Sequence, residues 1–232
     1  MGAMKPTISN IFGLDQSHLT QVPGCGNATR YLVFPAFDDF TLLRETLAEH
    51  GVQLAIASSY RSFQQQQLIW NEKFNGNRAV FDADGLPLDM SSLDDVEKVF
   101  AILRWSALPG ASRHHWGSDL DIYDLAALPQ GYQLKLIPAE YQSNGPFSLL
   151  GDLLDQHFAV GDFCGFYRPY MDKLSAVANE PWHISHRASA QQSMSILTKS
   201  ALQQLVENSD IAGKAAVLER FDEIWQRFVA ID

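Results

Sequence analysis

Residues 112–124, Ser-Arg-His-His-Trp-Gly-Ser-Asp-Leu-Asp-Ile-Tyr-Asp, hold the densest group of side chains that can do chemistry. Asp119 and Asp121 alternate with apolar residues, and this period of two predicts a strand with both carboxylates on one face. One of the adjacent histidines, His114 or His115, can then converge with Asp121 on a single point. Imidazole and carboxylate are ligands of catalytic zinc, which takes three protein ligands and keeps one position open.

A second stretch, Glu-Pro-Trp-His at residues 180–183, can complete such a site. Pro181 favours an extended backbone at Glu180, which argues for a loop that enters a strand. His183 offers a third ligand, and Glu180 offers the carboxylate that a general base beside a metal-activated water needs. A solvated, hydrogen-bonded turn is the alternative for any one of these residues, because single motifs often match by chance.

Arg61 lies in a third polar stretch, Ser-Ser-Tyr-Arg-Ser at residues 58–62. The capping-box pattern of Ser62 and Gln65 predicts a helix from there to about Phe74. Arg61 is therefore expected at a strand-to-helix junction, where its guanidinium can bind a carboxylate or a developing oxyanion. A surface arginine paired with an acidic neighbour is the alternative.

Together, the three stretches resemble the signature of the VanY/VanX-type zinc D-Ala-D-Ala carboxypeptidases and dipeptidases, which share a fold with the Hedgehog N-terminal domain. Residues 58–62 are similar to S-x-Y-R-S, residues 112–121 to S-x-H-x-x-G-x-A/D-x-D, and residues 180–183 to E-x-W-H. The likeness covers roughly residues 38–187. Asp119 stands where many members have Ala, and it adds a charge near the metal.

The resemblance implies a single Zn²⁺ per chain, held by His114, Asp121 and His183. It also separates the adjacent histidines, because the motif position falls on His114. His115 is then a bystander or a group that lies behind the ligands.

The same resemblance implies a hydrolase. Glu180 would be the catalytic base, Arg61 would bind substrate and stabilise the transition state, and Ser112 would help to hold the terminal carboxylate of the substrate. The implied substrate is a peptidoglycan stem peptide or another D-Ala-terminated peptide, cleaved next to its C-terminal D-amino acid. A D,D-dipeptidase, an L,D-carboxypeptidase and a non-enzymatic zinc-binding module are the alternatives.

The elements around the motifs predict an α+β fold, with a small, mostly antiparallel sheet flanked by helices as in the Hedgehog and D,D-peptidase fold. We expect a helix from Asp38 or Asp39 to about His50, another capped by Ser91 or Ser92, and a short strand at 182–184.

One zinc-peptidase-like domain is expected over residues 1–187, with a helical C-terminal extension at 188–232 that packs on it. The extension shows two helical patterns, at about 190–207 and 211–229. Residues 125–146 look like an insertion, with an edge strand at 132–137.

Composition narrows the class of protein. At 232 residues and 46% hydrophobic, the chain is long enough for one sizeable core. A net charge of −10, without a run of Lys or Arg, disfavours nucleic acid and anionic membrane surfaces as partners. No stretch approaches the roughly 18 apolar residues of a membrane span.

Two further properties stay open at this point. The N-terminus lacks the apolar core of a signal peptide, which favours the cytoplasm; removal of a leader would make the periplasm the alternative. Cys25 and Cys164 can form one disulfide or remain two buried thiols. Oligomeric state does not follow from the sequence.

Overall fold

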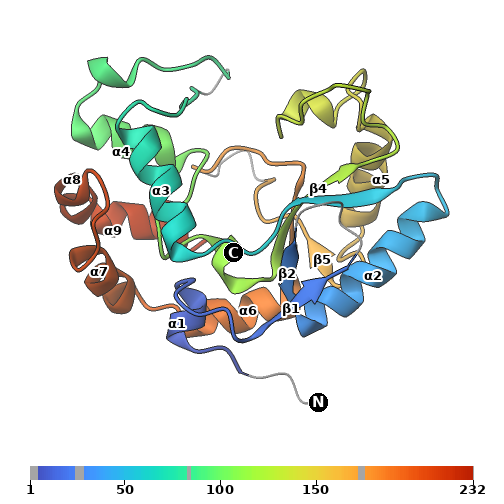
Figure 1. Cartoon of the computed structure of the whole chain (residues 1–232), viewed down its shortest axis with the longest axis horizontal. Coiled ribbons are helices and arrows are strands. Elements are labelled where there is room, and N and C mark those ends of the chain that lie inside the picture. The colour runs from blue at the N-terminus through green and yellow to red at the C-terminus, as the bar shows by residue number, and fades with distance from the viewer. Residues whose placement is uncertain (1–4, 24–28, 83–84, 172–175, 232) are drawn as a thin grey trace.

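The computed structural model describes residues 5–23, 29–82, 85–171 and 176–231. A sheet half and a helical half lie side by side (Figure 1). The strands are β1 (Leu19–Val22), β2 (Arg30–Val33), β3 (Leu54–Ser58), β4 (Asp119–Asp124), β5 (Phe166–Tyr167) and β6 (His183–His186). The helices are α1 (Ile8–Ile11), α2 (Phe34–Ala48), α3 (Phe63–Phe74), α4 (Asp95–Leu103), α5 (Ser148–Phe158), α6 (Arg187–Ile196), α7 (Lys199–Glu207), α8 (Lys214–Glu219) and α9 (Phe221–Ile224).

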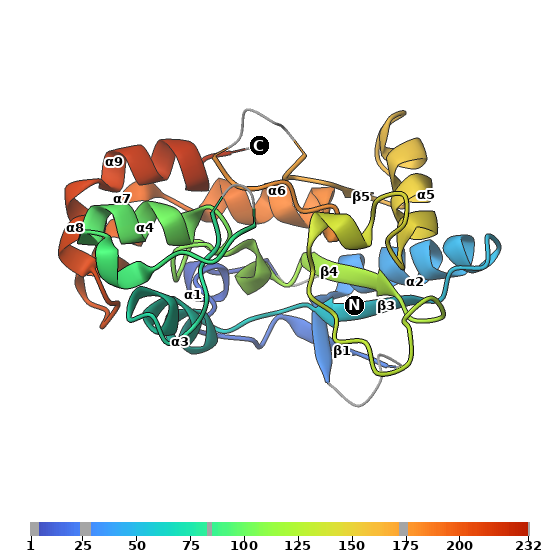
Figure 2. The ribbon, with the colours of Figure 1, turned by 90° about the horizontal axis from the view of Figure 1, so that it is seen from above.

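The sheet half confirms the predicted α+β class. Its main sheet is antiparallel with strand order β3-β4-β6-β5, and β1 pairs with β2 in a separate two-stranded sheet. Leu120 and Ile122 of β4 are fully buried in one apolar cluster with side chains of α2 and α5, such as Leu43 and Leu154. Figure 2 shows α2 and α5 together at this end of the molecule. The alternating pattern of β4 thus leaves the face that carries Asp119 and Asp121 for polar contacts.

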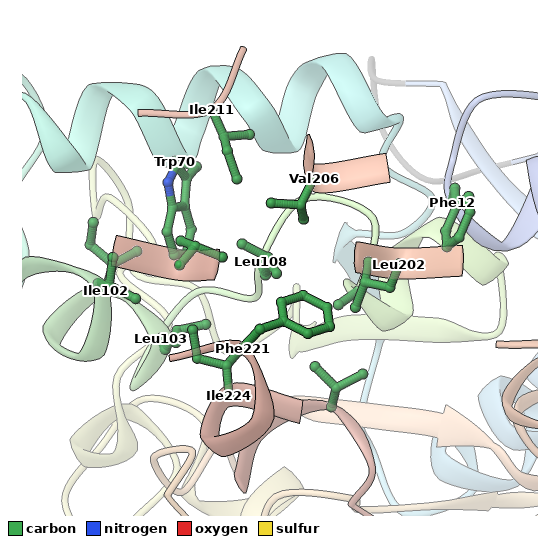
Figure 3. Close-up of a cluster of buried hydrophobic side chains, with 14 of the residues drawn as sticks. Phe12, Trp70, Ile102, Leu103, Leu108, Leu202, Val206, Ile211, Phe221 and Ile224 are labelled. Atoms are coloured by element: carbon green, nitrogen blue, oxygen red, sulfur yellow. The ribbon is translucent and has the colours of Figure 1, made fainter. Parts of the chain in front are cut away.

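The helical half has an apolar cluster of its own, shown in Figure 3. Trp70 of α3 and Leu103 of α4 pack there with Leu202, Val217 and Phe221 of the C-terminal helices. Burial of several large side chains, each contributing about 1.5–3 kcal/mol relative to exposure, stabilises this assembly. The C-terminal helices are therefore packed against α3, which leads directly from one of the candidate site motifs.

Two predicted helix starts need correction. The helix predicted from Asp38 or Asp39 begins at Phe34, because β2 ends at Val33 and a proline occupies the first turn of α2. The helix assigned a serine cap is instead capped by Asp94, whose carboxylate accepts a hydrogen bond from the Glu97 backbone in a capping box. Ser91 and Ser92 belong to a separate 3₁₀ turn, Met90–Ser92. The strand predicted at 182–184 is present as β6, and the capping box at Ser62 is confirmed.

The edge strand predicted at 132–137 is wrong: the structure forms no strand there. The Glu140 carboxylate accepts hydrogen bonds from the Tyr132 hydroxyl and from the backbone N–H groups of Lys135 and Ile137. Leu136 has a φ of 53°, which is incompatible with a strand. Local hydrogen bonds to one buried carboxylate thus replace a ladder.

The C-terminal extension contains more breaks than predicted. The pattern at 190–207 is divided into α6 and α7 by Thr198, which is extended and caps α7 through its hydroxyl. The pattern at 211–229 is divided into α8, α9 and a π-helical turn, Trp225–Val229. The expected boundary between residues 1–187 and 188–232 stays a prediction, as does the cytoplasmic location.

Among the described residues, no helix is both long and apolar enough to cross a membrane. Cys164 is a free, half-buried thiol, and Cys25 lies outside the described residues.

Candidate metal and catalytic site

Strand pairing brings two of the three motifs together. Asp121 of β4 lies directly opposite His183 of β6. The turn that leads into β4 depends on Gly117, whose φ is 71° and where a Cβ would lie 2.3 Å from the nearest side-chain atom. Only glycine fits this combination of a left-handed backbone and close packing. His114, on the 3₁₀ turn Arg113–Trp116, is thereby folded back over the strand.

His114, Asp121 and His183 form a buried group whose potential ligand atoms all lie within 4.8 Å of one another. His114 Nε2 lies 3.4 Å from Asp121 Oδ2, and His183 Nδ1 lies 3.1 Å from Asp121 Oδ1. Zinc binds such atoms at about 2.0–2.2 Å in a tetrahedron, and separations of this size suit it. The structure thus brings together the three predicted ligands, and the donor set fits Zn²⁺ with one position left for water or substrate.

The other nitrogen of each imidazole is also bound. His114 Nδ1 lies 2.8 Å from the carbonyl oxygen of Ser59, to which it donates a hydrogen bond. His183 Nε2 lies 2.9 Å from the Asp119 carboxylate, so it donates there. These contacts leave Nε2 of His114 and Nδ1 of His183 to face the metal position.

Asp119 is fully buried within a network of its own. Arg113 Nε donates to Asp119 Oδ2 at 2.9 Å, and the hydroxyls of Ser118 and Ser185 donate to Oδ1. Burial would raise the pKa of Asp119, but Arg113 and His183 outweigh burial and hold that pKa well below its usual range. The charge that the sequence adds near the metal is therefore compensated by Arg113.

Glu180 lies beside the ligand group without belonging to it. Its Oε2 is 3.6 Å from His183 Nδ1, and its side chain is 14% exposed. Burial, aided by the charge of Asp121, outweighs the opposing charges of His183 and Arg61 and raises the pKa of Glu180 to about 7. A carboxylate with a pKa near neutrality is suited to take a proton from water and to return it.

Arg61 lies at the predicted strand-to-helix junction. Its backbone N–H donates to the His114 carbonyl, and its guanidinium donates to Gln66 and Ser58. Arg61 and the buried Ser112 both line the cavity that contains the metal ligands. All six predicted site residues therefore meet in one place.

Two other histidines are occupied elsewhere. His115 Nδ1 is 2.6 Å from the Arg61 carbonyl, and His115 Nε2 accepts from the Gly110 backbone. Burial lowers the pKa of His115 to about 3. His186 is buried, forms a hydrogen bond with the Asp39 carboxylate and caps α6.

Comparison with known proteins agrees with this geometry. The family profile of VanY, D-alanyl-D-alanine carboxypeptidase, matches residues 30–189. This chain belongs to the VanY family. Membership identifies it as a metallopeptidase and supports D-Ala-D-Ala peptidase activity on peptidoglycan-type substrates, while the type of peptidase is taken up below.

Two uncharacterized proteins of Haemophilus influenzae are similar to this VanY-family chain. One is 44% identical over 105 residues, covering 45% of this chain and 72% of the relative. The other is 32% identical over 124 residues, covering 53% of this chain and 92% of the relative.

Solved structures share the fold at low sequence identity. VanYB in complex with D-Alanine-D-Alanine matches with a TM-score of 0.52 and 20% identity, over 84% of this chain and 91% of that chain. The LdcB LD-carboxypeptidase matches with a TM-score of 0.52 and 19% identity, over 85% and 81%.

The VanY-family site of this chain opens into a cavity of about 740 Å³. The metal ligands, Glu180 and Arg61 line it together with residues 78–81 and 135–139. Segments beyond the three motifs therefore shape the space around the reacting groups.

Sequence reasoning missed part of the site. Arg113 and Ser185 hold Asp119, and neither is adjacent to it in the sequence. The period of two in β4 placed Asp119 on the correct face, but its partners depend on the pairing of β4 with β6. Lys73, twelve positions after Arg61, also lines the cavity, and no motif marks it.

Proposed function

We propose that this chain is a zinc-dependent carboxypeptidase that releases the C-terminal D-amino acid from peptidoglycan-type peptides ending in D-Ala-D-Ala. The observation that carries the proposal is the size of the cavity, about 740 Å³ around the ligand group. Pockets for drug-sized ligands span roughly 300–1,000 Å³. A free dipeptide would leave much of this space empty, whereas a longer peptide can extend into it.

His114, Asp121 and His183 would hold the metal, with donor atoms within 4.8 Å of one another. Bound zinc supplies a Lewis acid for the scissile carbonyl and lowers the pKa of water toward about 7. Glu180 would accept the proton of the attacking water and pass it to the leaving amine. Its burial beside His183 supports this role, because its raised pKa suits both steps.

Arg61 would face the carbonyl oxygen as negative charge develops on it. Gln66 and Ser58 accept hydrogen bonds from its guanidinium, so the group is oriented before substrate binds. Preorganised donors of this kind contribute about 2.7–4 kcal/mol to transition-state stabilisation. Ser112, buried at the same cavity, is the candidate to hold the terminal carboxylate.

The test is release of D-alanine from three substrates: a pentapeptide ending in D-Ala-D-Ala, the free dipeptide D-Ala-D-Ala, and a peptide ending in L-Lys-D-Ala. Zinc content is measured on the same samples before and after chelation. Fast release from the pentapeptide, lost on chelation and restored by zinc, supports the proposal. Preference for the free dipeptide would make the chain a dipeptidase, and preference for the L,D peptide an L,D-carboxypeptidase. Bound zinc with no turnover would favour a non-enzymatic zinc module.

A further inference from the structure

The residues that line the cavity carry mainly positive charge, whereas the protein as a whole is acidic. The chain has 17 Lys and Arg against 27 Asp and Glu. Among the described residues that line the cavity, however, the acidic ones are only Asp121 and Glu180, both at the metal position. The cationic ones are Arg61, Lys73, Arg78, Arg113 and Lys135. A cleft lined mainly by one sign of charge concentrates ligands of the opposite sign.

Three of these cations have other roles. Arg113 is paired with the fully buried Asp119. Arg61 donates to two neighbouring side chains at the metal end of the cavity. Lys135 has its Nζ 5.9 Å from the centre of the Tyr132 ring. Their charges are therefore balanced or engaged before substrate binds.

Of the five cations that line the cavity, Lys73 and Arg78 are the two without such a role. In the part of the chain that the structure describes, Lys73 has no carboxylate within ion-pair distance. Arg78 lies 3.7 Å from Glu72, but both side chains are substantially exposed, and solvent screens such pairs strongly. Burial, together with the charges of Arg78 and Arg61, lowers the pKa of Lys73 to about 8, although the charge of the Glu180 carboxylate acts in the opposite direction. Two neighbouring cations without a strong partner are suited to bind an anion that arrives with the substrate.

The backbone of Lys73 lies at the opposite end of α3 from Arg61. Arg61 precedes α3, and Lys73 lies in its last turn. The ten helical steps from Phe63 to Lys73 correspond to about 15 Å along the axis. A terminal carboxylate lies only one residue, about 3.8 Å between Cα atoms, beyond the scissile bond. The charges of Lys73 and Glu180 act on each other, so the Lys73 side chain reaches back toward the metal position. Its backbone is nevertheless anchored beyond the place of a terminal carboxylate, which suits an upstream residue of the peptide.

Resting on the proposed function, we infer that Lys73 and Arg78 form a subsite for a second carboxylate of the substrate, carried by a residue upstream of the scissile bond. The subsite selects acidic peptides over neutral ones of the same length. The terminal carboxylate of the substrate is bound by the groups near the metal.

The experiment compares two peptides that end in D-Ala-D-Ala and differ only in Glu or Gln upstream, with that residue placed in turn two, three and four positions before the C-terminus. We expect wild-type kcat/KM to favour the Glu peptide by about tenfold at one of these positions, mainly through KM, because a charge-assisted hydrogen bond contributes at least this much. Lys73→Met should abolish the preference, and Lys73→Arg should retain it. The matched control is Lys135→Met, which removes another cation that lines the cavity and should leave the preference intact.

Equal loss on both peptides in Lys73→Met, or no preference in the wild type at any position, would overturn the subsite. Binding of both peptides to the Glu180→Gln protein, measured by calorimetry, separates this result from failure of the proposed function. If the wild type cleaves neither peptide but Glu180→Gln still binds the Glu peptide more tightly, the subsite stands and the carboxypeptidase assignment falls. If both peptides are cleaved with equal kcat/KM, the carboxypeptidase assignment stands and the subsite falls.

Discussion

The two histidines of the metal site are held in different ways. His114, on the turn before β4, donates its second ring hydrogen to a backbone carbonyl, that of Ser59. His183, at the start of β6, donates its own to the carboxylate of Asp119. The rings lie edge to face, with centroids 5.0 Å apart, so the same small space contains a neutral support and a charged one.

The difference shows that the backbone supports the orientation of His114, whereas particular side chains support that of His183. Any sequence that folds this way offers the Ser59 carbonyl to His114. The support of His183 needs Asp119, which in turn needs Arg113 to compensate its charge in a buried position. The orientation of His183 should therefore respond to substitution of neighbouring side chains, whereas that of His114 should not.

The largest expected effect is loss of the metal when His114 is replaced. His114→Ala removes one of three ligands, so zinc content should fall from about one per chain to nearly none. His115→Ala is the matched control. His115 forms its hydrogen bonds with the backbone of Arg61 and Gly110, so this variant should retain its zinc. Metal analysis after dialysis measures both. Retention of zinc in His114→Ala would mean that the wrong histidine was chosen.

Substitution of Glu180 tests whether this residue, which lies close to His183, is itself a zinc ligand. Glu180→Ala should lower kcat by roughly 10²–10⁴-fold, the usual contribution of a general acid–base group, while zinc content stays unchanged. Glu180→Gln, which keeps the shape of the side chain, should behave in the same way. Loss of zinc from either variant would make Glu180 a ligand and remove the proposed base.

Asp119 tests the charged support directly. Asp119→Asn should weaken zinc binding by about 10–100-fold, the usual cost of removing a partner of a ligating histidine. Competition with a chromophoric chelator measures the affinity, and the absorption spectrum of the cobalt-substituted protein reports the ligand geometry. The matched control is Asp39→Asn, which removes a carboxylate 2.8 Å from the buried but non-ligating His186. Equal effects of both variants, on stability alone, would reduce Asp119 to a structural residue.

The comparison also explains how much of this protein could be predicted from its sequence. The period of two in β4 and the capping box at Ser62 are local patterns, so the faces of Asp119 and Asp121 and the junction at Arg61 could be predicted. Which of the adjacent histidines is the ligand came from the family motif. The structure adds the reason, since both nitrogens of His115 are bound elsewhere.

Long-range contacts could not be predicted in this way. The pairing of Asp119 with Arg113 and His183 requires the register between β4 and β6. The early start of α2 depends on where β2 ends, and the missing strand at 132–137 depends on one carboxylate, Glu140. A partner distant in sequence decides the first case and a neighbouring element the second, whereas at 132–137 hydrogen bonds to a nearby carboxylate overrode the strand pattern.

The smallest expected effect is a change in the number of protons that the protein releases when it binds zinc. Burial opposes the imidazolium form of His183, but its hydrogen bonds to Asp119 and Asp121 outweigh burial and raise its pKa to about 10 in the metal-free protein. Burial lowers the pKa of His114. At pH 8.5, therefore, His183 carries a proton that zinc must displace, whereas His114 and Glu180 have already lost theirs.

Zinc binding at this pH should release about two protons, one from His183, because ligating imidazoles must be neutral, and one from the bound water, whose pKa zinc lowers toward about 7. Calorimetry in buffers of different ionisation enthalpy measures the number. In Asp119→Asn the pKa of His183 falls toward neutrality, so the release should shrink, while in Asp39→Asn it should remain. An unchanged count in Asp119→Asn would show that the charge of Asp119 does not act on His183, and the contrast between the two histidines would then rest on geometry alone.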